Sequence, residues 1–354
     1  MKDITPFLLS LLSLPGLSGY EQPASDIIAE TWRPLVDELT IGRLGSLHGL
    51  RKSRLNEKRP TLMIAAHMDA IGLMVKTVEH GFLTITTIGG IDPRVLPGQL
   101  MIVHGKKDLP GLVQLVPDRL VNNQTSSKAP EKKDLFVDTG LTEKELVDLV
   151  KPGDLISFAQ PPFELTGGYI AGHSLDNRAS VAALTICLEE IKNYNLDCNV
   201  VAAATVQEEL HAIGAATSTF SVRPDLAFAV DVTFAKGPGS NDYRSFPLGE
   251  GPAIGLGANN HPALTQKMTS LAEELDIPYF IEAMPTSSGT DGMAMQITAN
   301  GIPTQVLGMS LRYMHTSVEM TSLKDIARTG RLLARFITDL NPETFKSMFE
   351  EKVS

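Results

Sequence analysis

The sequence predicts an α/β fold, a mostly parallel sheet covered by helices, with a β-rich domain inserted into it. Apolar runs alternate with amphipathic segments before residue 70 and after residue 164, as strands and helices do in such folds. Between these parts the pattern changes to short alternating runs separated by Gly and Pro. The length of 354 residues exceeds one ordinary domain of roughly 100 to 200 residues, so two domains are expected.

The first 70 residues predict two helices and a buried strand. Residues 3–14 have the apolar spacing of an amphipathic helix, which Pro15 ends, and residues 22–32 have the same spacing. TLMIAAH, at 61–67, is an unbroken apolar run, as expected for a strand buried on both faces of a parallel sheet. Residues 1–70 therefore form the first part of the main domain.

The inserted domain is predicted at residues 71–163. Its apolar runs are short and Gly or Pro separates them, as in HGFLTITTIGG, PGQLMIVHG, LPGLVQLV and KPGDLISF. This pattern is typical of a small β domain. Residues 142–150 add one short helix.

From residue 164 the alternation of strands and helices returns and continues towards the C-terminus. The apolar patterns predict helices at 177–193, 262–275 and 322–340, and strands at 199–206, 225–232, 279–283 and 303–308. Residues 164–354 thus complete a main domain that the insertion makes discontinuous. In sheets of this kind, ligands bind beyond the carboxyl ends of the strands.

Acidic residues and a histidine stand at these strand ends. His67 ends one predicted strand, Glu208 and Glu209 follow the next, and Asp231 lies at the end of a third. Unpaired carboxylates at a sheet edge are costly unless a cation compensates them. A pair of metal ions is the simplest interpretation of this joint placement.

The candidate ligands are carboxylates and imidazoles, with no thiolate among them. This set of ligands suits Zn, Co or Mn, and zinc is the first choice of metal on general grounds. Two metal ions roughly 3.5 to 4 Å apart need a bridging carboxylate and further ligands on each side. Asp176, just before a predicted helix, suits the bridge. His67 and Asp231 could complete one metal site, and Glu209 and His315 the other.

Glu208 remains free in this arrangement and is the candidate general base. It could take the proton from the attacking water and pass it to a leaving amine. Asp69, two residues after His67, is placed to accept a hydrogen bond from the imidazole and fix its tautomer.

These residues lie in a series of motifs that covers nearly the whole chain: PGLSGYE, AAHMDAIGLMV, GFLTITTIGGIDPRVLPGQ, SLDNR, TVQEE, VDVT, SSGTDGMA and RYMHTSVE. In order and spacing they resemble the tetrahedral (TET), dodecamer-forming dinuclear metallo-aminopeptidases. That family includes proteins labelled glutamyl aminopeptidase, deblocking aminopeptidase or cellulase M.

The resemblance implies a phosphorylase/hydrolase-like catalytic domain, interrupted by a β-rich domain that forms dimers. Dimers would assemble into a tetrahedral dodecamer whose chamber admits small unfolded peptides, and one N-terminal residue would be removed at a time. The resemblance assigns the metals to His67, Asp176, Glu209, Asp231 and His315. It also assigns the base to Glu208 and a supporting role to Asp69.

The sequence departs from the family after the glutamate pair. Relatives usually continue with a Gly-Leu-Arg-Gly type stretch, whereas this chain reads LHAIGAA. His211 in this stretch and Asp291 in SSGTDGMA are the candidates for substrate binding. We expect the remaining histidines to be surface or structural residues: His48, His80, His104, His173 and His261.

The composition argues against two classes of partner. The net charge of −10, with 31 Lys and Arg against 41 Asp and Glu, does not suit nucleic-acid binding. The N-terminal apolar run has no small-residue cleavage site and is shorter than the ~20 residues that span a bilayer. We therefore expect no nucleic-acid or membrane binding and a cytoplasmic location. Cys187 and Cys198 are expected to be buried thiols.

Other functions stay open. The same two-metal chemistry serves amidohydrolases and deacylases that act on small acylated substrates on related folds. A catalytically silent assembly of the same fold is a further alternative. A serine nucleophile in SSGTD is disfavoured, because the sequence around it lacks a nucleophile elbow.

Overall fold

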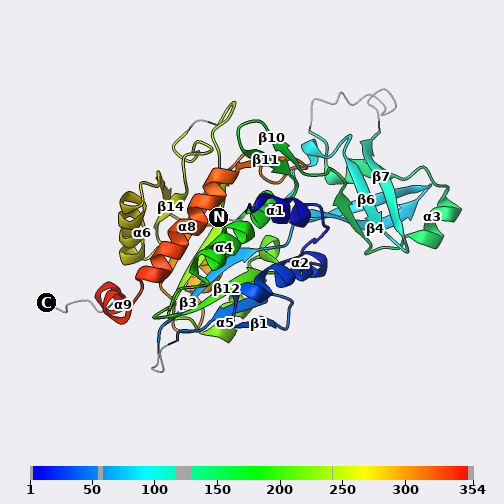
Figure 1. Ribbon diagram of the computed structural model, residues 1–354. Coiled ribbons are helices and arrows are strands. Elements are labelled where there is room, and N and C mark those ends of the chain that lie inside the picture. Colours follow the sequence, from blue (N-terminus) through cyan, green and yellow to red (C-terminus); the bar gives the residue numbers. More distant parts are fainter. Residues whose placement is uncertain (1–2, 55–58, 117–128, 241, 350–354) are drawn as a thin grey trace.

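The molecule consists of an α/β body and a β barrel beside it (Figure 1). The computed structural model describes residues 3–54, 59–116, 129–240 and 242–349. The body is built from residues on both sides of the barrel in sequence, so the chain leaves the body after β3 and returns to it after β9.

An eight-stranded sheet runs through the body in the order β1-β2-β12-β3-β13-β16-β14-β15. Its central strands β12, β3, β13 and β16 are parallel neighbours. At one edge β1 and β2 are antiparallel, and at the other edge β14 runs antiparallel to β16. The strands are β1 (Glu38–Ile41), β2 (Leu47–Arg51), β3 (Thr61–His67), β12 (Asn199–Thr205), β13 (Leu226–Phe234), β14 (Ala253–Gly257), β15 (Phe280–Met284) and β16 (Thr304–Leu311).

Helices cover both faces of this sheet. Alternate residues of β3 point to opposite faces, so Leu62 and Ile64 pack with α2, α4, α6 and α8, whereas Met63 and Ala65 pack with α5 and α7. Both faces are therefore apolar, which explains the continuous apolar run of this strand. The helices of the body are α1 (Thr5–Leu12), α2 (Gln22–Trp32), α4 (Leu175–Ile191), α5 (Ile213–Val222), α6 (Pro262–Glu274), α7 (Asp291–Gln296), α8 (Leu323–Asp339) and α9 (Pro342–Phe349).

The barrel is closed in the order β4-β5-β8-β7-β6-β9 and has an apolar core of its own. Closure leaves none of these strands with an unpaired edge. Its elements are β4 (Gly72–Glu79), β5 (Phe82–Ile88), β6 (Leu100–His104), β7 (Asp108–Leu115), β8 (Leu135–Asp138), α3 (Glu143–Leu149) and β9 (Leu155–Phe158). All of them lie inside the range expected for the inserted domain.

A small antiparallel sheet joins the two parts of the molecule. It contains β10 (Phe163–Leu165), β11 (Tyr169–Gly172) and β17 (Glu319–Ser322), in that order. β11 leads towards the start of α4, and β17 leads directly into α8. This sheet therefore holds the segments before Asp176 and after His315 next to each other.

The α/β fold expected from the sequence is confirmed, with two refinements. The sheet is parallel only in its centre, because β14 and β2 pair antiparallel with their inner neighbours. Several short elements were not expected, among them β1, whose residues are mostly exposed, and α7, which has six residues. Neither shows a long apolar run, so neither gives a clear pattern in the sequence.

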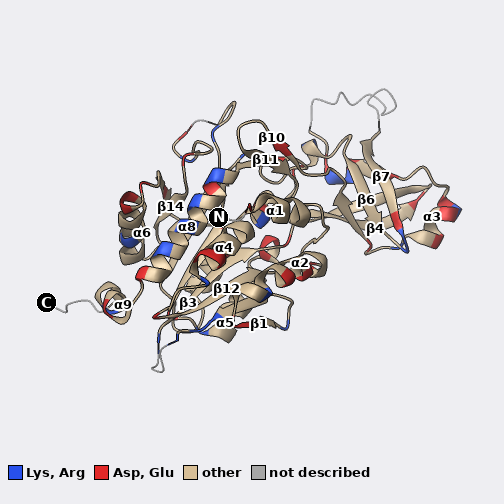
Figure 2. Cartoon of the chain, in the orientation of Figure 1, with Lys and Arg blue, Asp and Glu red and all other residues tan. Residues whose placement is uncertain are grey.

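Charged residues are spread over many elements of the chain, and α8 carries a row of basic residues (Figure 2). Three of these have acidic neighbours: Arg328 lies 3.9 Å from Asp325, Arg331 lies 3.9 Å from Glu190, and Arg335 lies 2.7 Å from Glu274. These acidic neighbours therefore neutralise much of the positive charge of α8. Within the described ranges, no helix has the length and apolarity needed to cross a membrane.

Candidate metal centre and cavity

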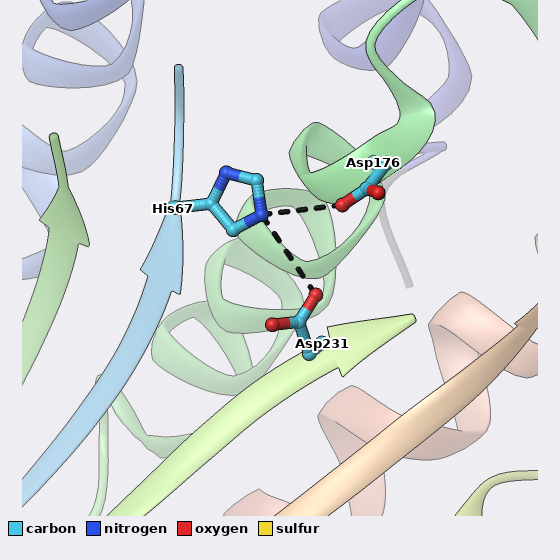
Figure 3. Close-up of side chains that lie close together, drawn as sticks. All are labelled: His67, Asp176 and Asp231. Atoms are coloured by element: carbon cyan, nitrogen blue, oxygen red, sulfur yellow. Dashed lines mark ion pairs between the residues drawn. The ribbon is translucent and has the colours of Figure 1, made fainter. Parts of the chain in front are cut away.

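The site lies where two central strands separate. β3 and β13 are paired from Leu226 to Ala229, but their ladder stops there. Asp231 on β13 and His67 at the end of β3 therefore face each other across a gap (Figure 3). The gap opens at the carboxyl ends of the parallel strands, where ligands bind in sheets of this type. Asp231 is not at the strand end expected from the sequence, because β13 continues to Phe234.

Asp176 from the start of α4 completes a first group with these two residues (Figure 3). His67 Nε2 lies 3.2 Å from Asp176 Oδ1 and 3.8 Å from Asp231 Oδ1. All three residues are buried. The peptide bond between Asp176 and Asn177 is cis.

A second group forms around the other oxygen of the same carboxylate. His315 Nε2 lies 3.3 Å from Asp176 Oδ2 and 3.4 Å from Glu209 Oε1. Asp176 therefore presents one oxygen to each group. This is the arrangement expected of a carboxylate that bridges two metal ions.

Glu208 is next to the first group without belonging to either. It begins the short 3₁₀ turn Glu208–Leu210, and its Oε2 lies 3.7 Å from His67 Nε2. Glu209 follows it in the turn and belongs to the second group. The two adjacent glutamates are thus directed to different places.

Asp69 supports the turn that carries the glutamates. Its oxygens accept hydrogen bonds from the backbone N–H of Glu208 at 3.0 Å and of Glu209 at 3.3 Å. They also accept one from the Ser18 hydroxyl at 2.6 Å. The distance from His67 Nδ1 to Asp69 Oδ1 is 3.4 Å, and Nδ1 makes no hydrogen bond. Asp69 therefore orients the glutamate turn at least as much as the imidazole.

Glu319 is a functional candidate that the sequence analysis missed. It is almost fully buried on β17, and its two oxygens accept hydrogen bonds from the backbone N–H of Asp176 and of His315, both at 2.9 Å. One carboxylate thus holds the backbone of two members of the second group, Asp176 and His315. The only sequence signal is its place in RYMHTSVE, four residues after His315.

The barrel also reaches the site. Gly90, after β5, lines the cavity described below, and a Cβ atom there would lie 3.2 Å from His315 Nδ1. A Cβ on the neighbouring Gly89 would meet Ile71 at 2.6 Å and Glu209 Oε2 at 3.3 Å. The absence of a side chain at these two glycines therefore leaves room for the candidate ligands.

Left-handed backbone conformations are concentrated beside the candidate ligands. The residues with positive φ include Ser174 (68°), Gln207 (55°), His211 (74°), Ala212 (54°) and His315 (61°). Such conformations cost non-glycine residues on the order of 1 to 3 kcal/mol each and persist where the surroundings enforce them. The backbone around the site is therefore held in place by its packing.

The carboxylates exceed the positive charge that the two histidines supply. Burial, with help from Asp231 and Asp291, raises the pKa of Glu208 to about 9, although His67 opposes the rise. Burial raises the pKa of Asp231 well above its usual value. Hydrogen bonds to Asp176 and Glu209 raise the pKa of His315 to about 11. The carboxylates and histidines of the site must therefore share protons unless other cations are bound there.

This donor set fits divalent metal ions. Donors bound to one tetrahedral zinc at roughly 2.0 to 2.2 Å lie roughly 3.3 to 3.6 Å apart. The donor pairs described above are separated by 3.2 to 3.8 Å, and the atoms of each group lie within 4.8 Å of one another. Bound cations would also take over the role of the shared protons.

A cavity of about 760 Å³ opens over the two groups. His211 lines it, as expected for a substrate-binding residue, although Asp291 does not. Asp291 is buried behind the wall, where its Oδ2 accepts a hydrogen bond from the Thr205 hydroxyl at 2.5 Å, and Thr290 lines the cavity instead.

Comparison with known proteins supplies the family. The model of the M42 glutamyl aminopeptidase family matches residues 45–332. This chain belongs to the M42 family. Members of this family are aminopeptidases, which are hydrolases that act on peptide bonds, and the chain is an enzyme of that class. M42 peptidases are metalloenzymes, and this member has two groups of residues that could hold metal ions.

Individual relatives match over almost the whole chain. Lysyl aminopeptidase from Pyrococcus furiosus is 31% identical over 341 residues, which are 95% of this chain and 97% of the relative. An aminopeptidase from the archaeon Desulfurococcus kamchatkensis has a similar structure, with a TM-score of 0.91, 32% identity and 99% of both chains covered. The TET1 peptidase of Pyrococcus horikoshii also has a similar structure, with a TM-score of 0.82 and 28% identity. The match covers 96% of this chain and 100% of that chain. The TET1 peptidase can assemble into a tetrahedron or a large octahedral shell.

Proposed function

We propose that this M42 member removes N-terminal residues from peptides with the help of two divalent metal ions, zinc first, with cobalt or manganese as alternatives. The observation that carries the proposal is the placement of Asp176, whose two oxygens lie 3.2 and 3.3 Å from His67 and His315. His67, Asp176 and Asp231 would hold one metal ion. Asp176, Glu209 and His315 would hold the other.

When bound, the metal ions would polarise the scissile carbonyl and lower the pKa of water. Glu208 would take a proton from the attacking water and deliver it to the amine that leaves. Its position at the cavity wall, 3.7 Å from His67 Nε2 but in neither group, suits this transfer. Asp69 would keep the glutamate turn in register through its hydrogen bonds to the backbone of Glu208 and Glu209.

His211 and Asp291 would act on the substrate side in different ways. His211 lines the cavity directly. Asp291 would act through α7, the helix that it begins, because Met293 and Ala294 of this helix line the cavity. We propose His211 as a substrate contact and Asp291 as a residue that positions this wall.

The variant Glu208→Gln tests the role of the base. We expect it to retain two metal ions per subunit but to lower kcat on an unblocked peptide by roughly a hundredfold to ten-thousandfold, since only the proton acceptor is lost. Elemental analysis with steady-state kinetics measures both quantities, and Glu143→Gln, on the exposed side of α3, is the control. Activity equal to that of the native enzyme would remove Glu208 from this role.

A choice of substrates separates the proposal from its alternatives. The metal-loaded enzyme should hydrolyse aminoacyl anilides with a free amine but not N-acyl amino acids. Hydrolysis of N-acyl amino acids alone would favour an amidohydrolase or deacylase. Failure on a broad panel of unblocked peptides and on N-acyl substrates would favour a catalytically silent assembly.

We also propose that the barrel, within an inserted domain at 71–163, mediates dimerisation, and that dimers form a tetrahedral dodecamer. Residues 1–70 and 164–354 would form the catalytic domain. Exposed apolar side chains on the barrel support this role, since Leu100 is 63% exposed and Val147 is 55% exposed. The assembly reported for the TET1 peptidase of P. horikoshii also supports it. The cytoplasmic location stays a prediction.

Analytical ultracentrifugation tests the assembly. The native chain should sediment at about twelve times the mass of one subunit. Leu100→Asp should shift it towards smaller species, because a charge placed in an apolar interface must be desolvated. A monomer at micromolar concentration would contradict the proposed assembly while leaving the chemistry of the site unaffected.

A further inference from the structure

A carboxylate stands in the wall of the cavity, apart from the metal groups. Glu282 on β15 lines the same cavity as Glu208. Its Oε1 accepts a hydrogen bond from the Thr233 hydroxyl at 2.7 Å. Thr233 is two residues beyond Asp231 on β13, so it lies on the same face about 7 Å further along the strand.

The described residues that line the cavity give the carboxylate of Glu282 no Lys or Arg as a partner. Glu282 Oε2 is buried and makes no hydrogen bond within the part of the chain that the structure describes. Burial raises the pKa of Glu282, opposed only by the hydrogen bond from Thr233. A buried carboxylate oxygen without a partner is costly, so a ligand that donates a hydrogen bond to it would be favoured.

The walls of the cavity around Glu282 include apolar side chains. Phe234, Met293 and Ile297 line the cavity and are 58%, 43% and 69% exposed. Gly308 leaves space beside the carboxylate, because a Cβ atom there would lie 3.2 Å from Glu282 Oε2. Apolar walls with one acidic group suit a side chain that has a methylene stem and a cationic end.

We infer that the cavity selects peptides whose N-terminal residue is lysine or arginine, with Glu282 binding the side-chain cation. This inference rests on the proposed aminopeptidase function and specifies its substrate class. An acidic N-terminal residue would meet Glu282 without a compensating cation and would be a poor substrate, because like charges repel.

The first test needs no variant. Lysine and norleucine anilides have side chains with the same methylene stem, but only lysine carries an ammonium group. We expect kcat/KM of the metal-loaded native enzyme to be roughly 10- to 100-fold higher for lysine, the range expected for a charge-assisted hydrogen bond. Glutamine anilide should likewise be cleaved faster than glutamate anilide.

The variant Glu282→Gln identifies the residue responsible. It should lower kcat/KM for lysine and arginine anilides by roughly 10- to 100-fold and leave norleucine and leucine anilides within about threefold of the native values. Glu143→Gln, which removes an exposed glutamate on the barrel, should change neither group of substrates.

The outcomes separate the two proposals. Equal cleavage of lysine and norleucine anilides by the native enzyme would overturn the selectivity while leaving the aminopeptidase function standing. A uniform loss on all substrates in Glu282→Gln would overturn it as well and point to the α-amine or to the fold. Failure on every unblocked substrate would instead overturn the proposed function.

Discussion

Glu319 supports the backbone of the candidate centre without belonging to either group of candidate ligands. Its carboxylate accepts from the backbone of Asp176 and of His315, which come from segments far apart in the chain. An amide in its place keeps one acceptor oxygen and turns an N–H₂ group towards a backbone donor. The two ligands would then be held less firmly.

We therefore expect Glu319→Gln to weaken metal binding by roughly 10- to 100-fold, the effect typical of groups that orient ligands. Isothermal titration of the metal-free protein with zinc measures this change. The melting temperature of the metal-free variant, taken alongside, separates loss of orientation from general damage. Unchanged zinc affinity would assign Glu319 to the fold alone.

His211 occupies a conformation that suits glycine. Its φ of 74° is in the left-handed region, which a β-branched residue enters only at high cost. We expect His211→Gly to leave the free energy of unfolding unchanged or raise it by up to about 1 kcal/mol, whereas His211→Val should lower it by about 1 to 2 kcal/mol. Urea unfolding of both variants measures the difference, and equal values would show that the turn is not strained.

The sequence identified candidate site residues where a histidine or an acidic residue stands at the end of a predicted strand. His67 and the pair Glu208 and Glu209 could be placed because buried strands precede them. Glu319 and Glu282 could not, since each is an acidic residue in a short strand and neither stands at the end of a buried strand. Their importance depends on which backbone or side-chain groups the fold brings to them.

At the scale of elements, the site depends on the separation of β3 and β13. Both strands were predictable from apolar runs, but their divergence after Ala229 was not, because pairing between distant segments leaves no local pattern. The antiparallel edge strands escaped prediction for a related reason. β1 is largely exposed, so its residues follow no regular burial pattern.

We expect His173 to make the junction of barrel and body sensitive to acid. It follows β11, its ring centroid lies 4.6 Å from that of Phe158 on β9, and burial, together with the charge of Arg178, lowers its pKa to about 4. In the unfolded chain a histidine takes up a proton below about pH 6.5. Between these values the unfolded state binds more protons, so the free energy of unfolding falls as the pH decreases.

We expect this effect to reach about 2 to 3 kcal/mol near pH 4.5. Urea unfolding at pH 7 and near pH 4.5 should show the native protein losing that much more stability than His173→Gln. The exposed His80, replaced in the same way, serves as the control. Parallel losses in the native protein and in His173→Gln would mean that His173 is free to protonate in the folded state.

At the scale of the whole molecule, the barrel and the body have separate apolar cores. Metal binding should therefore stabilise them unequally. A metal bound at 100 times its Kd contributes about 2.7 kcal/mol to the folded state. That contribution belongs to the body, which supplies all the candidate ligands.

Removing the metal with a chelator should increase hydrogen exchange at the end of β3, in β13 and at the start of α4, while β6 and β7 of the barrel keep their protection. Exchange measured by mass spectrometry before and after chelation, with zinc added back as the reversal, follows both regions in one sample. Equal deprotection of the barrel would show that the two cores unfold together.

The order of the candidate ligands along the chain has a consequence for biosynthesis. His67 emerges from the ribosome early, but its group needs Asp231, and the other group needs His315 and the support of Glu319. A nascent chain that has already formed the whole barrel still lacks a complete centre. If these residues are the ligands, we expect peptide cleavage to begin only after most of the polypeptide has been made, so that an unfinished chain cannot hydrolyse neighbouring nascent chains.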